Sequence, residues 1–400
     1  MQTAIIDWPL TPLTGWGGYG IQLAQALMEQ GRFKPLLPAR CDCTVHCDLH
    51  WQGALQHLEA CSQGLRKHLD QAEAAGMLPL STKASLVFSP MGNHVPPVRF
   101  AGALPVGVTF FECSSFGAVD LERMREFPLL ITGSRWNQAV LQRLGVENAR
   151  MVHQGIDPAL FNPVPVPQLL QRSMVIFSGG KLEGRKGQDV VIAAFREFVR
   201  SHPDALLIAA WGNVGDVGLS TIGLTPHVDG SPERGRLEAI SQWLESNGVP
   251  AANVWVLPCV VNRQLPHLIK QADVAVFASR CEGGTNLMAM ETLACGVPTL
   301  VSANTGHLDL IELGLDHCLP IGEAGLGQVS TKLIQPYGGD PDGIWGETDP
   351  AELLLWWQRL AKEKASWRQR GAAAATGIMG MSWRRSMAQL LGLIEPLLQP

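Results

Sequence analysis

The chain has 400 residues, which exceeds the size at which a single hydrophobic core keeps growing, so we expect two domains. Apolar residues make up 46% and charged residues 17%, which places the chain among globular proteins and excludes the disordered class. The net charge of −5, without a basic run, excludes the electrostatic footprint of a nucleic-acid-binding protein. An anionic ligand therefore needs a local cationic site.

Three features of the sequence bear on the location of the protein. The start, MQTAIIDWPL, lacks the basic region of a secretory signal, and we find no charge-free apolar run long enough to span a bilayer. The nine cysteines are an odd number without regular spacing, which favours reduced thiols over a disulfide framework. We expect a cytoplasmic protein, and peripheral contact with a membrane stays open.

The first predicted elements are a strand at TAIIDW (3–8) and a helix at IQLAQAL (21–27). The loop between them is rich in glycine and contains Gly15, Gly17, Gly18 and Gly20. Three of these fit the pattern G-x-G-x-x-G, but a proline and an aromatic residue interrupt the tight turn that a dinucleotide site requires. No acidic residue follows at a clear second strand end, so NAD binding is not indicated.

A cysteine- and histidine-rich stretch follows, RCDCTVHCDLHW at 40–51. Its candidate ligands for zinc are Cys41, Cys43, His46, Cys47 and His50. The stretch has no C-x-x-C pair, and a short strand and loop would not easily turn four of these side chains onto one ion. We therefore expect no metal here.

The remainder of the chain alternates short apolar runs with segments of helical period, for example ALLIAAWG (205–212) and DVAVFAS (273–279) around helix-like stretches. This alternation is typical of parallel βαβ units, so the predicted class is α/β. The proline-rich FNPVPVPQ (161–168) resembles an extended linker. We predict one domain at 1–165 and a second at 166–380.

The second predicted domain opens with a strand, VIFSGG (175–180), and a loop that carries three cations, Lys181, Arg185 and Lys186. A helix, QDVVIAAFREF, follows at once, and cations beside a helix N-terminus favour an anion. The loop is not a Walker A motif, because Gly184 is followed by Arg-Lys-Gly. The alternative is a solvated basic turn.

A third loop lies between the strand DVAVFAS and the helix NLMAMETLAC (286–295). In a parallel sheet, ligands bind where loops leave the carboxyl ends of strands. The glycines of this loop let backbone N–H groups approach a phosphate. Glu291, about one and a half turns into the helix, is placed to reach a ribose, and Glu282 to meet sugar hydroxyls. The alternative is a glycine-rich turn with two surface glutamates.

The C-terminal part is helical by period in two stretches, 351–370 and 382–400, and we predict a C-terminal helix at 381–400 whose packing against the first domain stays open. Before them, Asp340 and Asp342 in YGGDPDG mimic the D-x-D of metal-dependent transferases. Their glycine- and proline-rich surroundings favour a turn.

Taken together, four segments resemble the retaining glycosyltransferases of the GT-B fold (group 1, family 4-like), which include sucrose synthases and phosphatidylinositol mannosyltransferases. They cover most of residues 130–310, and the TGWGGYG stretch is a weaker echo of the same family. The segments are HQGIDPALFNP, SGGKLEGRKG, LPHLIKQADVAVFASRCEGG and EGGTNLMAMETLACGVP.

The resemblance implies two Rossmann-like domains that face each other across a cleft, with C-terminal helices. The second domain would hold a nucleotide-diphosphate sugar, and the first an unidentified acceptor: a saccharide, a lipid, a small molecule or a protein. The sugar would be transferred with retention, without metal or cofactor, and the leaving phosphate would help to take the acceptor proton. The implied catalytic residues are Glu112, Lys181, Lys186 and Glu282. The implied donor-binding residues are Gly17, Gly18, Gly180, Lys181, Lys186, Glu282, Gly283, Gly284, Thr285, Asn286, Leu287 and Glu291.

Three departures from the family pattern are visible. Glu282 and Glu291 enclose eight residues, one more than the family's spacing. Lys181 stands where arginine is usual, which keeps the charge and loses the planar fork. Glu112 stands where many members carry a histidine, and His94 is its rival for the reaction centre. These departures leave a second hypothesis, a catalytically silent GT-B subunit that acts as a binding partner or scaffold, and a third, a metal-dependent transferase that uses Asp340 and Asp342.

Overall fold

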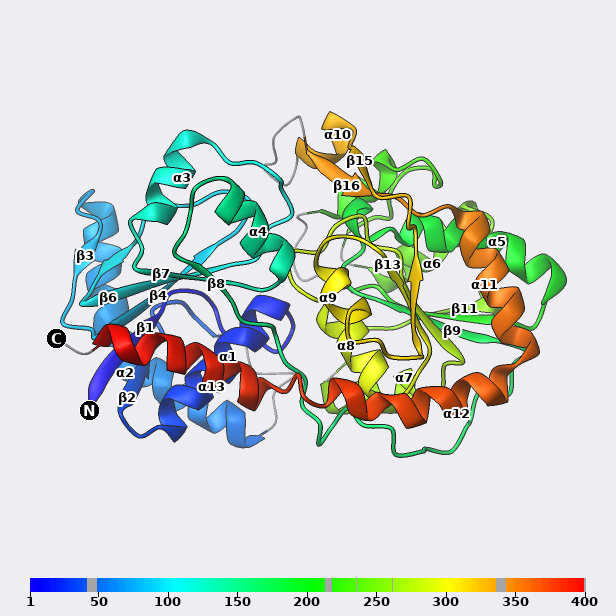
Figure 1. Cartoon of the computed structure of the whole chain (residues 1–400), viewed down its shortest axis with the longest axis horizontal. Helices are drawn as coiled ribbons and strands as arrows, with labels where there is room; N and C mark the ends of the chain where they lie inside the picture. The colour runs from blue at the N-terminus through cyan, green and yellow to red at the C-terminus, as the bar shows by residue number, and fades with distance from the viewer. Residues whose placement is uncertain (42–48, 213–217, 235, 261, 336–342, 399–400) are drawn as a thin grey trace. The chain divides into compact units, whose positions relative to one another are not determined.

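The computed structural model describes two compact units, of which one is built from three separate stretches of chain (Figure 1). Unit 1 comprises Met1–Phe111, Phe116–Gly155 and Trp383–Pro400, and unit 2 comprises Glu112–Ser115 and Ile156–Ser382. Unit 2 thus begins before the expected boundary at residue 165. The described residues are 1–41, 49–212, 218–234, 236–260, 262–335 and 343–398.

Unit 1 contains a parallel six-stranded sheet in the order β2-β1-β4-β6-β7-β8. Its central strands are short apolar runs whose residues are buried, as expected for a sheet covered on both faces. The strands are β1 (Gln2–Ile6), β2 (Phe33–Leu36), β4 (Leu86–Met91), β6 (Leu104–Thr109), β7 (Leu129–Thr132) and β8 (Ala149–Met151). A separate two-stranded pair is formed by β3 (Leu80–Ser81) and β5 (Phe100–Ala101).

Two helices of unit 1 begin at residues whose side chains cap them. Thr14 accepts a hydrogen bond from the backbone N–H of Gly17 at 3.0 Å, and Ser134 accepts one from Asn137 at 3.2 Å, so each side chain satisfies a free N–H of the first turn. The helix at the end of the chain, α13, packs against α1 and shares the core of this unit (Figure 1). The helices are α1 (Gly15–Glu29), α2 (Leu49–Ala74), α3 (Ala118–Arg125), α4 (Arg135–Arg143) and α13 (Trp383–Ile394).

Unit 2 contains a second parallel sheet, in the order β11-β10-β9-β12-β13-β14. This is the strand order of a Rossmann sheet, in which the order reverses between the first and the fourth strand along the chain. The strands are β9 (Val175–Gly179), β10 (Leu206–Ala210), β11 (Val254–Val256), β12 (Val274–Phe277), β13 (Thr299–Ser302) and β14 (Cys318–Ile321).

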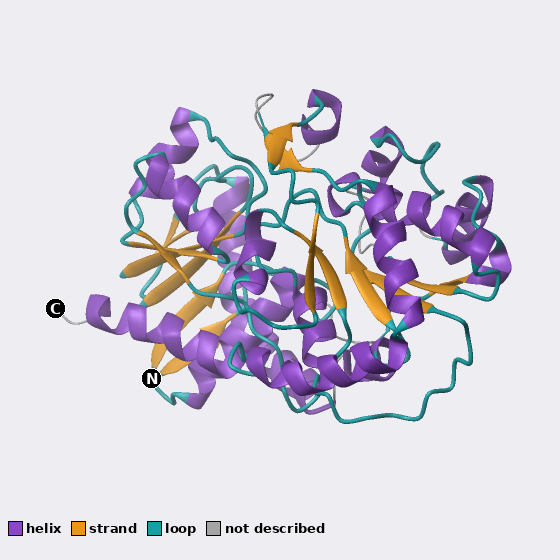
Figure 2. Ribbon diagram, turned by 45° about the vertical axis from the view of Figure 1, so that its right-hand side comes forward, coloured by secondary structure: helices purple, strands orange, loops and turns teal. Residues whose placement is uncertain are grey.

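Successive residues of these strands point to opposite faces, so the sheet supports two separate cores. Ile176 packs in one hydrophobic cluster with Phe195 of α5 (Gln188–Ser201), and its neighbour Phe177 packs in the other with Leu293 of α8 (Leu287–Ala294). Helices therefore lie on both faces of the sheet (Figure 2). The prediction of an α/β chain with Rossmann-like sheets is confirmed.

The other helices of unit 2 include two near the C-terminal end that meet at Glu363 and replace the single stretch expected at 351–370. A small antiparallel pair of strands, β15 (Leu326–Gln328) and β16 (Ile344–Gly346), precedes them. The helices are α6 (Leu237–Ser246), α7 (Leu265–Ile269), α9 (Leu308–Ile311), α10 (Thr331–Ile334), α11 (Pro350–Lys362) and α12 (Lys364–Ala374).

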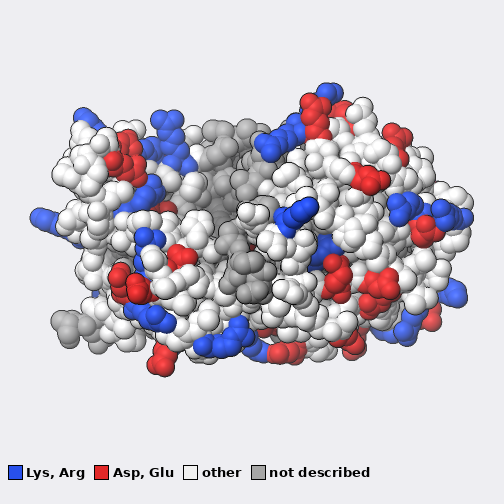
Figure 3. Space-filling model, turned by 90° about the horizontal axis from the view of Figure 1, so that it is seen from above, with Lys and Arg blue, Asp and Glu red and all other residues white. Residues whose placement is uncertain are grey.

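The surface carries charges of both signs. On the face seen in Figure 3, basic and acidic side chains lie interspersed, so that no single sign dominates it. Within the described parts of the chain, none of the helices combines the length and the apolar character needed to cross a membrane.

Candidate functional site

The candidate site lies at the point of unit 2 where the strand order reverses. Strands β9 and β12 are neighbours in the sheet. The next strand of the chain, β10 after β9 and β13 after β12, is added on opposite sides of this pair. In open parallel sheets this arrangement opens a crevice at the carboxyl ends of the two strands, where ligands bind. The loop after β9, here called the cationic loop (180–187), and the loop after β12, here called the glutamate loop (278–286), both leave from this edge.

The two loops are packed backbone against backbone. Gly187, the last residue of the cationic loop, has φ of +69° and precedes the first residue of α5. A Cβ atom on Gly187 would lie 1.9 Å from the carbonyl oxygen of Ala278. Only glycine fits both the left-handed backbone and this contact. The glycine therefore fixes the cationic loop against the start of the glutamate loop.

The three cations of the cationic loop have different surroundings. Lys181 has an exposed side chain, and its carbonyl accepts a hydrogen bond from Gln188 Nε2 at 2.6 Å. Arg185 is buried in the short 3-10 turn Gly184–Lys186, and Lys186 is half-buried. The structure thus directs Arg185 and Lys186 toward the glutamate loop. Gly180 joins β9 to this loop with φ of +113°.

Glu282 is the most highly coordinated carboxylate of the site. Lys186 Nζ donates to both of its oxygens, at 2.7 and 2.8 Å. Ser279 Oγ donates to Oε1 at 2.6 Å, and Asn286 Nδ2 donates to the same oxygen at 3.0 Å. Arg185 Nη1 donates to Oε2 at 3.3 Å. Burial alone would raise the pKa of Glu282, but the charges of Lys186 and Arg185 outweigh it and hold the pKa at about 2.

Arg185 connects Glu282 with two further carboxylates. Its Nη2 donates to Glu183 Oε1 at 2.5 Å, and its Nη1 lies 3.6 Å from Glu112 Oε1. Glu112 is therefore beside the cationic loop, and its carbonyl accepts hydrogen bonds from Trp345 Nε1 at 2.7 Å and from the Cys281 thiol at 3.6 Å. This brings the stretch Glu112–Ser115, which comes from the first half of the sequence, into unit 2.

A second arginine, Arg280 of the glutamate loop, connects this loop with the cationic loop. Arg280 is 2% exposed and donates to both carboxylate oxygens of Asp189 at 2.8 Å. It also donates to the Gly184 carbonyl at 2.5 Å and to Glu347 at 2.7 Å. Burial would lower the pKa of Arg280, but the hydrogen bond and charge of Asp189 raise it above its ordinary value. Because Arg280 belongs to the glutamate loop and donates to Gly184 of the cationic loop, it fixes the position of one loop relative to the other.

The remaining residues of the glutamate loop lead into α8. Thr285 and Asn286 are buried, and Asn286 has φ of +63°, which is uncommon for a residue with a side chain. The Asn286 amide oxygen caps α8 by accepting from the N–H of Ala289 at 3.4 Å, and its amide nitrogen donates to Glu282. Gly283 and Gly284 precede them, and Leu287 begins the helix and is half-buried.

Glu291 lies on the second turn of α8 and is half-buried. Burial raises the pKa of its carboxyl to about 8. Its surroundings thus differ from those of Glu282, whose carboxyl group is kept ionised by Lys186 and Arg185.

A third loop, at 303–307 after β13, was not expected from the sequence. It forms hydrogen bonds with the backbone of Glu282. Thr305 Oγ1 accepts from the N–H of Glu282 at 2.8 Å, and the N–H of Gly306 donates to the Glu282 carbonyl at 3.0 Å. His307 Nε2 lies 3.2 Å from Asn286 Nδ2. Burial lowers the pKa of His307 to about 4, so the imidazole is neutral at pH 7. The available signal was that the neighbouring strand also ends at this edge of the sheet.

Three predicted residues lie in unit 1. Gly17 and Gly18 are in the first turn of α1, and a Cβ atom on Gly17 would lie 2.2 Å from the Thr11 carbonyl oxygen. Gly17 therefore lets α1 approach the preceding loop. His94 is exposed in the loop after β4.

The two metal hypotheses concern residues that lie largely outside the described chain. Cys43, His46 and Cys47 of the zinc candidate fall at 42–48, and Asp340 and Asp342 fall at 336–342. Among the described residues, we find no group of three or more His, Cys, Asp or Glu side chains arranged to hold a metal ion.

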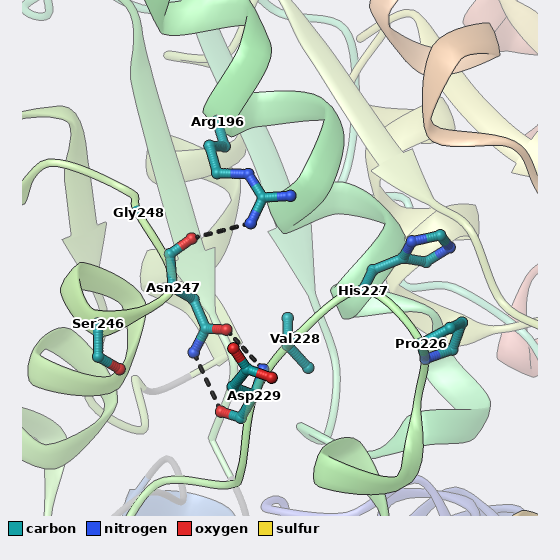
Figure 4. A pocket seen from close by; sticks show the side chains of 8 residues that line it. All are labelled: Arg196, Pro226, His227, Val228, Asp229, Ser246, Asn247 and Gly248. Atoms are coloured by element: carbon teal, nitrogen blue, oxygen red, sulfur yellow. Dashed lines mark hydrogen bonds between the residues drawn. The ribbon is translucent and has the colours of Figure 1, made fainter.

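A separate hollow in unit 2 has a volume of about 360 Å³ (Figure 4). Its polar contacts are internal: Arg196 Nη1 donates to the Asn247 carbonyl at 3.3 Å, and Asn247 Oδ1 accepts from the N–H of Asp229 at 2.7 Å. The cationic and glutamate loops contribute no residue to its lining, so it is not part of the candidate site. It is lined by Arg196, Pro226, His227, Val228, Asp229, Ser246, Asn247 and Gly248.

Comparison with known proteins relates part of unit 2 to a known family. Residues 166–318 match the family model described as "Glycosyl transferases group 1". The chain is 29% identical over 207 residues to a D-inositol 3-phosphate glycosyltransferase of Acidothermus cellulolyticus, and 30% identical over 166 residues to one of Segniliparus rotundus. These matches cover 49% and 42% of this chain, and 41% and 30% of the two relatives.

Solved structures show the fold of the whole chain. Sucrose-phosphate synthase from Thermosynechococcus elongatus is similar with a TM-score of 0.63 at 16% identity, over 99% of both chains. The HepE protein of Anabaena, in complex with UDP and glucose, is similar with a TM-score of 0.63 at 14% identity, over 99% of this chain and all of the other. At these identities the likeness shows the fold alone, and the prediction of the GT-B fold is confirmed. The chain has the GT-B fold, and its residues 166–318 match the model of the group 1 glycosyltransferases.

Proposed function

We propose that the protein transfers a sugar from a nucleotide-diphosphate sugar to an acceptor, with retention of configuration and without a metal ion. The observation that carries this proposal is the joint placement of Lys186, Glu282 and Glu291 at the strand-order reversal of a group 1 glycosyltransferase segment. Nucleotide-binding crevices of Rossmann sheets lie at this position.

The proposed reaction leaves a diphosphate, whose charge must be stabilised as the glycosidic bond breaks. Lys186 supplies an ammonium on a flexible stem, and α5 and α8 begin directly after the two loops of the crevice. Donors and dipoles fixed in advance at the position of developing charge lower the barrier of such a step. The metal-independent route rests on these groups.

The two glutamates take different parts in the proposal. Glu282 is ionised and held by several donors, so its oxygens suit the hydroxyls of the transferred sugar. Glu291, on the second turn of α8, is proposed to meet the ribose hydroxyls. Glu112, beside Arg185, is proposed to lie near the reacting carbon of the sugar. Retention rests on the family resemblance.

The relatives suggest the first compounds to test. HepE was solved with UDP and glucose, so UDP-glucose is the first donor, and the curated relatives are named for D-inositol 3-phosphate, so this compound is the first acceptor. We also propose that the protein acts in the cytoplasm, because the nine cysteines are an odd number without regular spacing, which favours reduced thiols over a disulfide framework.

A thermal-shift panel tests the donor. UDP, GDP, ADP and their glucose conjugates are added with and without EDTA, because a ligand that binds the native state raises its melting temperature. The expected result is a shift with one base that survives EDTA. A shift that disappears with EDTA contradicts metal independence, and no shift with any nucleotide favours the catalytically silent subunit.

Two variants then test the site. Lys186→Ala and Glu291→Ala are expected to abolish hydrolysis or transfer of the donor that binds, while the far-UV circular dichroism spectrum stays that of the wild type. Lys181→Ala is the matched control, because Lys181 is a lysine of the same loop whose side chain is exposed. This variant is expected to lose less activity than Lys186→Ala. Full activity in Lys186→Ala or Glu291→Ala removes the assignment of the site.

A further inference from the structure

Lys186, the proposed phosphate ligand, is already engaged by a carboxylate of its own chain. Its ammonium donates to both oxygens of Glu282, at 2.7 and 2.8 Å. The Lys186 side chain is 14% exposed and that of Glu282 is 6% exposed, so the ion pair is largely shielded from water. An anionic ligand that approaches Lys186 must therefore compete with Glu282.

The two members of this pair are not equally free to move. Glu282 is also held by Ser279, by Asn286 and by Arg185, and its backbone is held by Thr305. Lys186 carries its charge on a flexible four-carbon stem. The ammonium can therefore turn away to another anion while the carboxylate stays in place.

We infer that Glu282 is a specificity-determining residue that competes with the diphosphate for Lys186 and so weakens the binding of a nucleotide without its sugar. This inference rests on the proposed function. A bare nucleoside diphosphate draws the ammonium from Glu282 and leaves the carboxylate without that partner. A nucleotide sugar restores hydrogen bonds to the carboxylate through its hydroxyl groups. The site thereby prefers the substrate over the spent nucleotide.

The variant Glu282→Gln tests this directly. Glutamine has the same shape and keeps an oxygen for Ser279 and Asn286, but it removes the negative charge beside Lys186. We measure the Kd values of UDP, GDP, ADP and their glucose conjugates for both proteins by titration calorimetry. For the nucleotide that binds, the Kd of the bare diphosphate is expected to fall about tenfold in the variant. The Kd of the sugar conjugate is expected to fall less or to rise.

The control is Glu197→Gln, which removes the same charge from an exposed glutamate of unit 2 that pairs with Arg200. It is expected to leave both Kd values within about twofold of the wild type. An equal gain in Glu197→Gln assigns the effect to net charge and overturns the inference. If Glu282→Gln does not fold, Glu282→Asp draws the carboxylate back from Lys186, and the Kd of the bare diphosphate is expected to fall by a smaller factor of about three.

The outcomes separate the inference from the proposed function. If the wild type binds a nucleotide and Glu282→Gln binds the bare diphosphate equally well or more weakly, the inference fails and the proposed function stands. If neither protein binds any nucleotide, the proposed function fails and the inference fails with it.

Discussion

The pair formed by Arg280 and Asp189 offers a test of how the two loops of the crevice are held. The proposed change is Arg280→Met, which keeps a long stem of similar volume and removes the guanidinium. Asp189 is fully buried, so the change leaves a buried carboxylate without its bidentate partner. It also removes the donor that the Gly184 carbonyl accepts from.

The size of the effect follows from burial. Removal of one member of a buried ion pair costs about 3–5 kcal/mol, because the remaining charge stays desolvated. The double variant Arg280→Met/Asp189→Leu removes both charges, and replacement of a buried pair by apolar groups is often close to neutral. We expect the double variant to recover most of the loss, with a coupling of about 2 kcal/mol or more between the two positions.

The assay is urea denaturation followed by far-UV circular dichroism, with the free energy of unfolding taken from the transition that Arg280→Met shifts. Arg200→Met removes a guanidinium from an exposed pair with Glu197 and serves as the control, with an expected change below about 0.5 kcal/mol. A loss below about 1 kcal/mol in Arg280→Met, or a double variant no more stable than the single one, refutes this reasoning.

Three further predictions concern the cationic loop, α8 and the 303–307 loop. Gly187→Ala, at φ of +69°, is expected to lower the free energy of unfolding by about 3 kcal/mol or more in urea denaturation, because the added Cβ would overlap the Ala278 carbonyl. The control Gly230→Ala, at φ of +63° with open space around it, should lose about 1 kcal/mol, and equal losses in the two variants contradict the packing argument. Burial raises the pKa of Glu291 to about 8, so its ionisation destabilises the folded state increasingly as the pH rises from 4.5 to 8. The free energy of unfolding of Glu291→Gln should exceed that of the wild type by about 1–2 kcal/mol at pH 8 and equal it at pH 4. A difference that does not change with pH contradicts this prediction. Burial lowers the pKa of His307 from 6.5 to about 4, so protonation favours the unfolded state as the pH falls through this range. Between pH 6.5 and pH 4 the wild type should lose up to about 3 kcal/mol of stability relative to His307→Gln. An equal dependence of stability on pH in the two proteins refutes this prediction.

The general architecture is readable from the sequence because parallel βαβ units leave a local signal. Buried strands such as Val274–Phe277 are continuous apolar runs, and the helices between them have apolar residues at helical period. The break at Glu363 was not readable, because 351–370 has helical period throughout and the interruption depends on how α11 and α12 pack.

The site was predictable only as far as each strand end could be recognised separately. The cationic and glutamate loops were found because their charges and glycines stand directly after apolar strands. The pairing of Lys186 with Glu282, and the exposure of Lys181, depend on side-chain directions that a loop sequence does not fix. The 303–307 loop carries no acidic or basic run, so Thr305 and His307 gave no signal of chemistry before the strand order was known.

The place of α13 has a consequence for the order in which the protein assembles on the ribosome. Met387, Leu390, Leu391 and Ile394 fill the same hydrophobic cluster as Ile6 and Phe88, although more than two hundred residues of unit 2 are made in between. Domains generally form as units while the chain is synthesised from its N-terminus. Here the stretches of unit 1 that precede unit 2 are translated before it, whereas α13 is translated after it, so the core of unit 1 is completed only after the chain of unit 2 has been made.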